Sequence, residues 1–271
     1  GGGAWTTTDA GELLFVEKTD QRVWALVPGG APRPLTPDGL GMRFGDLQTA
    51  GDEVWAVRET HGAGAQEPSH DIVAIPLDGS AADDPAAVRR IVAGSHFLAS
   101  PRVSPDGTRL AWIAWDHPDM PWDATTLRVG ALGADGVVGV EVVAGGPGVS
   151  VLQPEWTDAR TIVFVSDITG WWNPYRWDGE TVAALAPADA ETGGPLWNLG
   201  IRWFLPLDDG RLLAVRTRGD DALVVIDPAH GTLRPIASPV TSRLLLDDVR
   251  GSRVLLRGAG ATTLGGLWLL D

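Results

Sequence analysis

Short apolar runs of strand length recur along the chain, and each follows a tight, mostly polar turn. The runs that share this pattern are DAGELLFVEK from Asp9, AGDEVWAVRE from Ala50, PDGTRLAWIAW from Pro105, TDARTIVFVS from Thr157, DDGRLLAVRT from Asp208 and VRGSRVLLRG from Val249. Their turn positions recur at intervals of roughly 40 to 56 residues and are Gly11, Gly51, Gly107, Ala159, Gly210 and Gly251. A repeat of this length predicts one supersecondary unit that is stacked several times.

A second apolar run follows each of the first ones. These runs are RVWALVP from Arg22, DIVAIPL from Asp71, TTLRVGAL from Thr125, NPYRWDG from Asn173, ALVVIDP from Ala222 and GLWLLD from Gly266. Most of them lead through a glycine turn, such as Asp78-Gly79 or Asp135-Gly136, into a last short strand. Asp-Gly suits such turns because glycine reaches positive φ without a steric cost. Each repeat therefore predicts an antiparallel meander of four strands.

These meanders predict an all-β protein, a β-propeller of four-stranded antiparallel blades with about six units in this chain. Helices are not expected, because Gly or Pro interrupts nearly every window that could hold an apolar stripe of helical period. A β-sandwich is the rival architecture, but sandwiches do not repeat one blade. Trp55, Trp112 and Trp268 lie within predicted strands and are expected to fill the core between blades.

Residues 1–271 are expected to form one propeller domain. The last unit stops after its third strand, at Leu270-Asp271, and the chain begins at Gly1 without a methionine. Since a propeller closes its ring to remove exposed strand edges, we expect this chain to be a piece of something longer.

The connections of such meanders sort onto two faces. The first-to-second and third-to-fourth strand connections emerge on one face and are short, whereas the other face carries the long connections. The long ones are expected over residues 60–70, 94–101, 116–125, 145–154, 167–174 and 188–198. We call their side the long-loop face. Because long loops cost ordering entropy and often carry binding sites, we expect the function there.

The long-loop face concentrates aromatic and acidic residues, namely Trp122, Trp171, Trp172, Trp197, Asp116, Asp119, Asp123, Asp167 and Glu191. Aromatic rings beside carboxylates suit a cationic or amphipathic ligand, such as the free amino terminus of a peptide. The alternative interpretation is that the acids cap loop turns and the rings pack against a second domain.

Charge and composition limit the classes of partner and cofactor that we expect for this chain. The formal net charge of -14 disfavours binding to nucleic acid and to anionic membrane surfaces. The chain has no cysteine, no HxH or HExxH pair and no phosphate-binding loop, so no metal and no cofactor is expected. The N-terminus has no signal-peptide pattern, and we expect a cytoplasmic protein. No GxSxG motif occurs, so no catalytic residue is predicted in this chain.

Three segments carry a resemblance to a known family. They are SPDGTRLAWIAWDHPDMPWDATTLRV from Ser104, VLQPEWTDARTIVFVSDITGWWNPYRWDGE from Val151 and GGPLWNLG from Gly193. They resemble the N-terminal propeller of the prolyl oligopeptidase family of serine peptidases. The similarity is greatest to the bacterial acylaminoacyl-peptidase and dipeptidyl-aminopeptidase-like members, a group that includes puromycin-hydrolysing aminopeptidases.

The resemblance implies a propeller, usually of seven blades in this family, that covers a C-terminal α/β-hydrolase domain absent from this chain. It also implies a role in admitting and anchoring short peptides or aminoacyl amides for a serine exopeptidase. The residues expected to face the substrate are Asp116, Trp122, Asp123, Trp171, Trp172 and Glu191. Two other functions remain open, a stand-alone propeller that binds another protein and a metal-dependent propeller lactonase.

Overall fold

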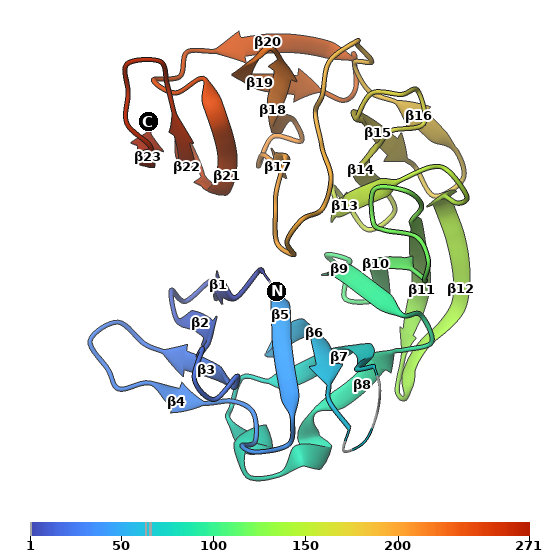
Figure 1. Cartoon of the computed structure of the whole chain (residues 1–271), viewed down its shortest axis with the longest axis vertical. Coiled ribbons are helices and arrows are strands. Elements are labelled where there is room, and N and C mark those ends of the chain that lie inside the picture. Colours follow the sequence, from blue (N-terminus) through green and yellow to red (C-terminus); the bar gives the residue numbers. More distant parts are fainter. Residues whose placement is uncertain (1, 63, 65–66) are drawn as a thin grey trace. The chain divides into compact units, whose positions relative to one another are not determined.

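The computed structural model describes residues 2–62, 64 and 67–271, and it is built almost entirely from antiparallel strands (Figure 1). Within these residues each sheet is made of strands that follow one another along the chain. Five sheets have four strands and the last has three, so the predicted all-β architecture of propeller blades is confirmed.

The chain divides into two compact units. Unit 1 comprises Gly1–Met120, Thr126–Val142 and Trp197–Gly200, and unit 2 comprises Pro121–Thr125, Val143–Leu196 and Ile201–Asp271. The first three sheets are β1 (Trp5–Thr7), β2 (Leu13–Val16), β3 (Val23–Leu26) and β4 (Arg33–Pro34); β5 (Met42–Ala50), β6 (Glu53–Thr60), β7 (Ser69–Pro76) and β8 (Arg89–Val92); and β9 (Phe97–Val103), β10 (Arg109–Trp115), β11 (Thr126–Gly133) and β12 (Gly136–Gly145).

The other three sheets are β13 (Val151–Trp156), β14 (Ile162–Ser166), β15 (Asn173–Trp177) and β16 (Val182–Ala184); β17 (Phe204–Pro206), β18 (Leu212–Arg218), β19 (Asp220–Asp227) and β20 (Thr232–Ile236); and β21 (Ser242–Arg250), β22 (Arg253–Ala259) and β23 (Gly266–Leu270). They belong to unit 2. The second and third strands of every sheet coincide with the apolar runs that the sequence repeats. Burial is most complete in β6, β10 and β14, whereas β23 is largely exposed.

Apolar side chains from neighbouring sheets make up the core of each unit. In unit 1 one cluster contains Trp55, Ile72, Leu110 and Trp112, and both tryptophans are buried as the sequence predicts. In unit 2 Trp268 packs, partly buried, against a cluster of aliphatic residues from β17 to β22. The rings fill the space between sheets, where large apolar area contributes most to stability.

Some connections differ from the sequence prediction. Phe97 begins β9 and Val151 begins β13, so much of the loops expected over 94–101 and 145–154 is strand, because the residues pair with the next strand and are buried. The turn after Asp78-Gly79 holds two short 3-10 helices, Ser80–Ala82 and Pro85–Ala87, instead of one tight turn. Gly1 and residues 63, 65 and 66 of the loop expected over 60–70 lie outside the described residues.

The first strands of four sheets contain a bulge. Register shifts interrupt the pairing of β5, β9, β13 and β21. One non-glycine residue with positive φ lies at an interruption in each of these four strands, and these residues are Asp46, Ser100, Gln153 and Arg243. Such a conformation is uncommon and costs conformational energy, so it persists only where surrounding contacts hold it.

Candidate functional site in unit 2

The long connection between β16 and β17, residues 185–203, carries Glu191, and the part around Glu191 is fixed to β15 and β18 of unit 2. Trp197–Gly200 of the same connection belong to unit 1. Asn173 on β15 pairs with the backbone of Ala188 through both its amide nitrogen (3.0 Å) and its amide oxygen (3.1 Å). Thr217 on β18 exchanges two backbone hydrogen bonds with Glu191, of 2.7 and 2.9 Å. This loop therefore presents Glu191 from a fixed backbone, which lowers the entropy cost of binding at that position.

Arg216 supports the same loop from β18. Its guanidinium donates to the carbonyl oxygen of Ala186 at 2.8 Å and to the hydroxyl oxygen of Thr192 at 3.0 Å. Burial lowers the pKa of Arg216, which shows that the cation is partly removed from water. Both partners of Arg216 lie in the loop, so the charge is used to position it.

Only one carboxylate oxygen of Glu191 has a hydrogen-bond partner among the described residues. Its Oε2 accepts a hydrogen bond from the backbone N–H of Trp172 at 2.7 Å. Its Oε1 accepts none from the residues that the structure describes. A carboxylate has about four lone-pair positions, so Glu191 can take further donors from a ligand while its orientation remains fixed.

Trp172, and Trp203 at the end of this loop, pack against the residues that follow Glu191. The rings of Trp172 and Trp203 are stacked, with centroids 6.5 Å apart and an interplanar angle of 14°. The backbone N–H of Thr192 donates to the carbonyl oxygen of Trp172 at 2.6 Å. A Cβ placed on Gly193 would lie 3.1 Å from Cβ of Trp172, so the loop contacts the tryptophan directly. Glycine at position 193 permits this close approach.

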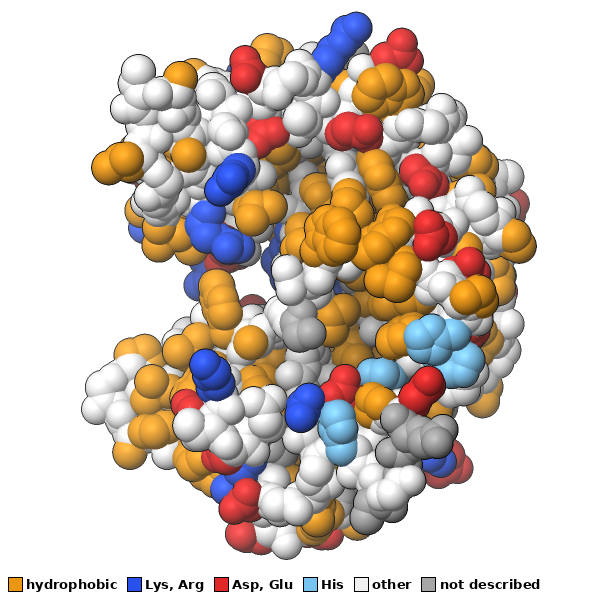
Figure 2. Space-filling model, viewed as in Figure 1, with side chains coloured by type: hydrophobic (Ala, Val, Ile, Leu, Met, Phe, Trp, Pro, Cys, Tyr) orange, Lys and Arg blue, Asp and Glu red, His pale blue; other side chains and the backbone are white. Residues whose placement is uncertain are grey.

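The structure brings two of the predicted site residues, Trp172 and Glu191, into contact. Trp171 is the neighbouring residue and is exposed, as is Ile168 in the same connection. Trp122 and Asp123 belong to unit 2 as well, with Trp122 half-buried and Asp123 exposed. Figure 2 shows hydrophobic side chains gathered over the β13 to β17 region.

Asp116 belongs to unit 1 and has partners of its own. Its Oδ1 accepts the backbone N–H of His96 at 2.6 Å and lies 3.3 Å from Nδ1 of the same histidine. The backbone N–H of His117 points at this Nδ1 as well, at 3.2 Å. Nδ1 can accept from His117 or donate to Asp116, but not both, so the tautomer of His96 selects its partner.

Histidines gather on one face of unit 1 (Figure 2). Phe97 connects them, because its ring lies 5.3 Å from that of His70 and 4.9 Å from that of His117. His117 in turn lies 5.3 Å from His96. Among the described residues, no group of three or more His, Asp or Glu side chains is arranged to hold a metal ion.

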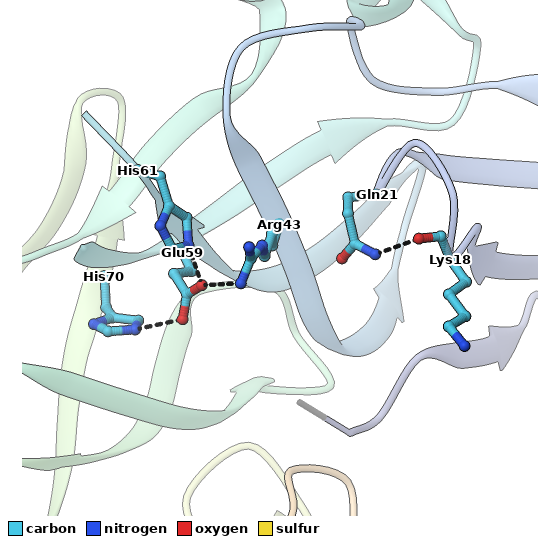
Figure 3. A network of polar contacts seen from close by, with 6 residues as sticks. All are labelled: Lys18, Gln21, Arg43, Glu59, His61 and His70. Atoms are coloured by element: carbon cyan, nitrogen blue, oxygen red, sulfur yellow. Dashed lines mark hydrogen bonds and ion pairs between the residues drawn. The ribbon is translucent and has the colours of Figure 1, made fainter. Parts of the chain in front are cut away.

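Glu59 lies at one end of this histidine group and is fully engaged (Figure 3). Its Oε1 contacts Nε2 of His61 at 2.5 Å and NH1 of Arg43 at 3.3 Å, and its Oε2 contacts Nε2 of His70 at 3.3 Å. Burial raises the pKa of the Glu59 carboxyl, but the hydrogen bonds with His61 and His70 outweigh burial and leave the pKa below its ordinary value. Glu59 is therefore ionised and already paired.

A hollow of about 960 Å³ lies in unit 1 at the turns that follow the first strands. Its walls include residues 8–12, 49–53 and 103–107, which belong to the short connections and not to the long-loop face. None of the six predicted site residues lines this hollow. The chemistry of Trp172 and Glu191, and not the volume of a cavity, therefore identifies the candidate site.

The sequence did not predict that Trp203 and Gln153 support the site. Trp203 stacks on Trp172, and Gln153 is hydrogen bonded to the backbone of Trp203. Trp203 was not predicted because nothing in the sequence places it next to Trp172, which lies about 30 residues earlier in the chain. Within the part of the chain that the structure describes, no helix has the length and apolar character needed to cross a bilayer.

Comparison with solved structures identifies proteins that are similar to this chain. The chain is similar to a puromycin-hydrolysing peptidase of Mycobacterium tuberculosis, with 39% identity and a TM-score of 0.90 over 98% of this chain and 42% of that one. It is also similar to a mutant puromycin hydrolase complexed with PGG, with 35% identity and a TM-score of 0.90 over 100% of this chain and 44% of that one. The chain thus spans less than half the length of these two proteins.

More distant structures share the fold alone. A prolyl endopeptidase superposes on 99% of this chain with a TM-score of 0.64 at 14% identity. No family model matches the sequence, and no curated protein matches it.

Proposed function

Because this chain belongs to the propellers of the prolyl oligopeptidase family of serine peptidases, we propose that it anchors and admits short substrates for an attached α/β-hydrolase domain. The substrates in this proposal are short peptides or aminoacyl amides with a free amino terminus. The chain itself supplies binding groups, and the hydrolase domain supplies the serine nucleophile. The reaction is that of a serine exopeptidase.

The observation that supports this proposal most strongly is that Glu191, on a fixed loop, has a hydrogen-bond partner at only one of its two carboxylate oxygens. Its Oε2 is held by the Trp172 N–H, which leaves Oε1 for a ligand. An ammonium group donates up to three hydrogen bonds and carries the opposite charge, so it fits such an oxygen better than a neutral group does. Trp171 is exposed beside this position and offers a ring face to the cation or to an apolar side chain.

The other predicted residues have smaller roles than Glu191 in this proposal. Asp123 and Trp122 belong to the same unit as Glu191 and are proposed to widen the acidic and aromatic surface. Asp116 belongs to unit 1 and is proposed to act with His96, to which its carboxylate is hydrogen bonded. We further propose that the protein is cytoplasmic, in keeping with its cysteine-free sequence.

Relatives that are structurally similar over nearly the whole chain support the proposal. One is a puromycin-hydrolysing peptidase and another is a puromycin hydrolase in complex with PGG. Puromycin is an aminoacyl amide with a free amino group, which is the class of substrate that Glu191 would recognise.

The experiment compares two proteins on one substrate, alanine 4-nitroanilide. The full-length gene product is expected to release nitroaniline, whereas residues 1–271 alone are expected to be inactive. A matched substrate, N-acetylalanine 4-nitroanilide, carries no ammonium group and is expected to have a higher KM with the full-length protein. Hydrolysis by residues 1–271 alone would contradict the proposal, and so would equal KM values for the two substrates.

A further inference from the structure

Gln153 is a buried polar residue in a conformation that its residue type avoids. It lies in β13 at the bulge between Leu152 and Glu155, with φ of 49° and 2% of its surface exposed. A buried amide needs hydrogen-bond partners, and a non-glycine residue at positive φ needs contacts that hold it there. Both requirements indicate that the position of this side chain is specified.

The side chain of Gln153 joins β13 to the start of the next sheet. Its Oε1 accepts the backbone N–H of Trp203 at 2.7 Å, and its Nε2 donates to the carbonyl oxygen of Phe204 at 2.5 Å. The oxygen faces a donor and the nitrogen faces an acceptor, so only one orientation of the amide satisfies both. Gln153 therefore fixes the backbone on both sides of the Trp203–Phe204 peptide.

Trp203 transmits this position to the candidate site. Its ring stacks on Trp172, and the backbone N–H of Trp172 holds Oε2 of Glu191. On the loop, a Cβ placed on Gly194 would lie 3.6 Å from Nε1 of Trp203. A continuous set of contacts thus runs from Gln153 through Trp203 and Trp172 to Glu191, all of it within unit 2.

Unit 1 contains a matching clamp without the aromatic pair. Asp46 in β5 has φ of 55° and is 1% exposed, and its Oδ2 accepts the backbone N–H of Ser100 in β9 at 2.6 Å. Both side chains therefore fasten one first strand to the next sheet. The residue that Asp46 fixes is a serine followed by proline, whereas Gln153 fixes a tryptophan that supports Glu191. Asp46 is the natural control for Gln153.

We propose that Gln153 is a positioning residue for the amine site: it sets Trp203 against Trp172 and so fixes the direction in which Glu191 presents its carboxylate. This inference rests on the proposed function of Glu191. Gln153 touches no substrate in this account, and its effect on the substrate passes through Trp203 and Trp172.

The test compares Gln153→Gly with Asp46→Gly, because each change removes one clamp and also relieves the positive φ at that residue. Gln153→Met is the second variant, since it keeps the length of the side chain and removes both hydrogen bonds. The first readout is the near-ultraviolet circular dichroism of the chain, where stacked indoles give a coupled signal. The second is KM and kcat of the full-length protein on alanine 4-nitroanilide, with the N-acetylated substrate alongside.

Both Gln153 variants are expected to lose the coupled tryptophan signal. They are also expected to raise KM for the free-amine substrate about three- to tenfold, the effect of losing a well-placed hydrogen bond, with kcat unchanged. Asp46→Gly is expected to keep both the signal and KM. A coupled signal that survives in both Gln153 variants would overturn the inference, and so would a lost signal with an unchanged KM.

Glu191→Gln separates this inference from the proposed function. If Glu191→Gln leaves KM for the free-amine substrate unchanged, the amine site itself is wrong. If Glu191→Gln raises KM but the Gln153 variants behave like Asp46→Gly, the amine site stands and only the positioning role of Gln153 is wrong.

Discussion

Two glutamates, one in each unit, show how the surroundings of a carboxylate decide what it can bind. Glu59 in unit 1 has both oxygens occupied, by His61 and Arg43 on one side and by His70 on the other. Glu191 in unit 2 has one oxygen held by the Trp172 N–H and the other available. Both are partly buried acids among aromatic residues, so composition alone does not separate them.

The difference lies in what each glutamate can still bind. A cation that approached Glu59 would have to displace a histidine or an arginine, and the gain would be offset by the loss of the existing partner. A cation that approached Glu191 would add a partner to an oxygen whose direction the backbone already fixes. An acidic residue with incomplete pairing is thus the better candidate for a ligand site.

The largest expected effect comes from removing the ring beneath Glu191. Trp172→Ala should destabilise the protein by about 3–5 kcal/mol, the usual cost of deleting a buried aromatic ring. Urea denaturation of both variants measures it, with Trp171→Ala as the control. Trp171 is 38% exposed whereas Trp172 is 9% exposed, so Trp171→Ala should cost much less. Equal losses would show that Trp172 is not the structural base of the site.

The next largest effect is expected from a change at Glu191 that tests whether its Oε1 binds an ammonium group. Glu191→Gln keeps an acceptor for the Trp172 N–H but removes the charge that an ammonium needs. KM for alanine 4-nitroanilide should rise about 10- to 100-fold, as expected for a charge-assisted hydrogen bond, whereas KM for the N-acetylated substrate should stay the same. A similar rise for both substrates would point to general damage of the loop instead of loss of an amine contact.

Glu59 should affect acid stability and not substrate binding. Because the folded pKa of Glu59 is lowered, its contribution is present above the unfolded value of about 4.3 and is lost as the pH falls through the folded pKa. Since His61 and Arg43 are exposed, water and salt screen their contacts with Glu59, and the contribution should be below about 1 kcal/mol. Glu59→Gln should therefore flatten the acid limb of unfolding free energy against pH. An unchanged acid limb would rule out this role.

The smallest effect is expected at the rim of the candidate site. Asp123→Ala removes an exposed carboxylate, and exposed charges are screened by water and salt, so KM for the free-amine substrate should rise only about two- to threefold. Asp119→Ala is the matched control, because Asp119 is an exposed acid of the same connection that belongs to unit 1. Equal changes in the two variants would remove Asp123 from the site.

The second and third strands of the sheets could be predicted from the sequence because they form apolar runs of strand length. The runs beginning at Asp9, Ala50 and Pro105 contain β2, β6 and β10. A glycine occupies the turn before the second strand in every repeat except the fourth, where Ala159 takes that position. The first strands were harder to locate. Residues such as Phe97 and Val151 begin strands that contain bulges, and a bulge breaks the alternation that a strand normally shows.

The site could be predicted only in part. Trp172 and Glu191 were both expected on the long-loop face, and they are in contact. Their support by Trp203 and Gln153 depends on contacts between residues about 30 to 50 positions apart, which no local pattern encodes. The pairing of Glu59 with His70 likewise arises only when β6 and β7 align. The degree to which each carboxylate is paired is therefore a property of the fold.

The most direct measurement is a crystal structure of the full-length protein, with its nucleophile inactivated, bound to a tripeptide that has a free amino terminus. We expect the ammonium nitrogen within hydrogen-bond distance, about 2.7–3.2 Å, of Oε1 of Glu191, with Glu59 still paired to His61 and His70. A tripeptide whose ammonium group lies away from Glu191, or against Glu59, would contradict it.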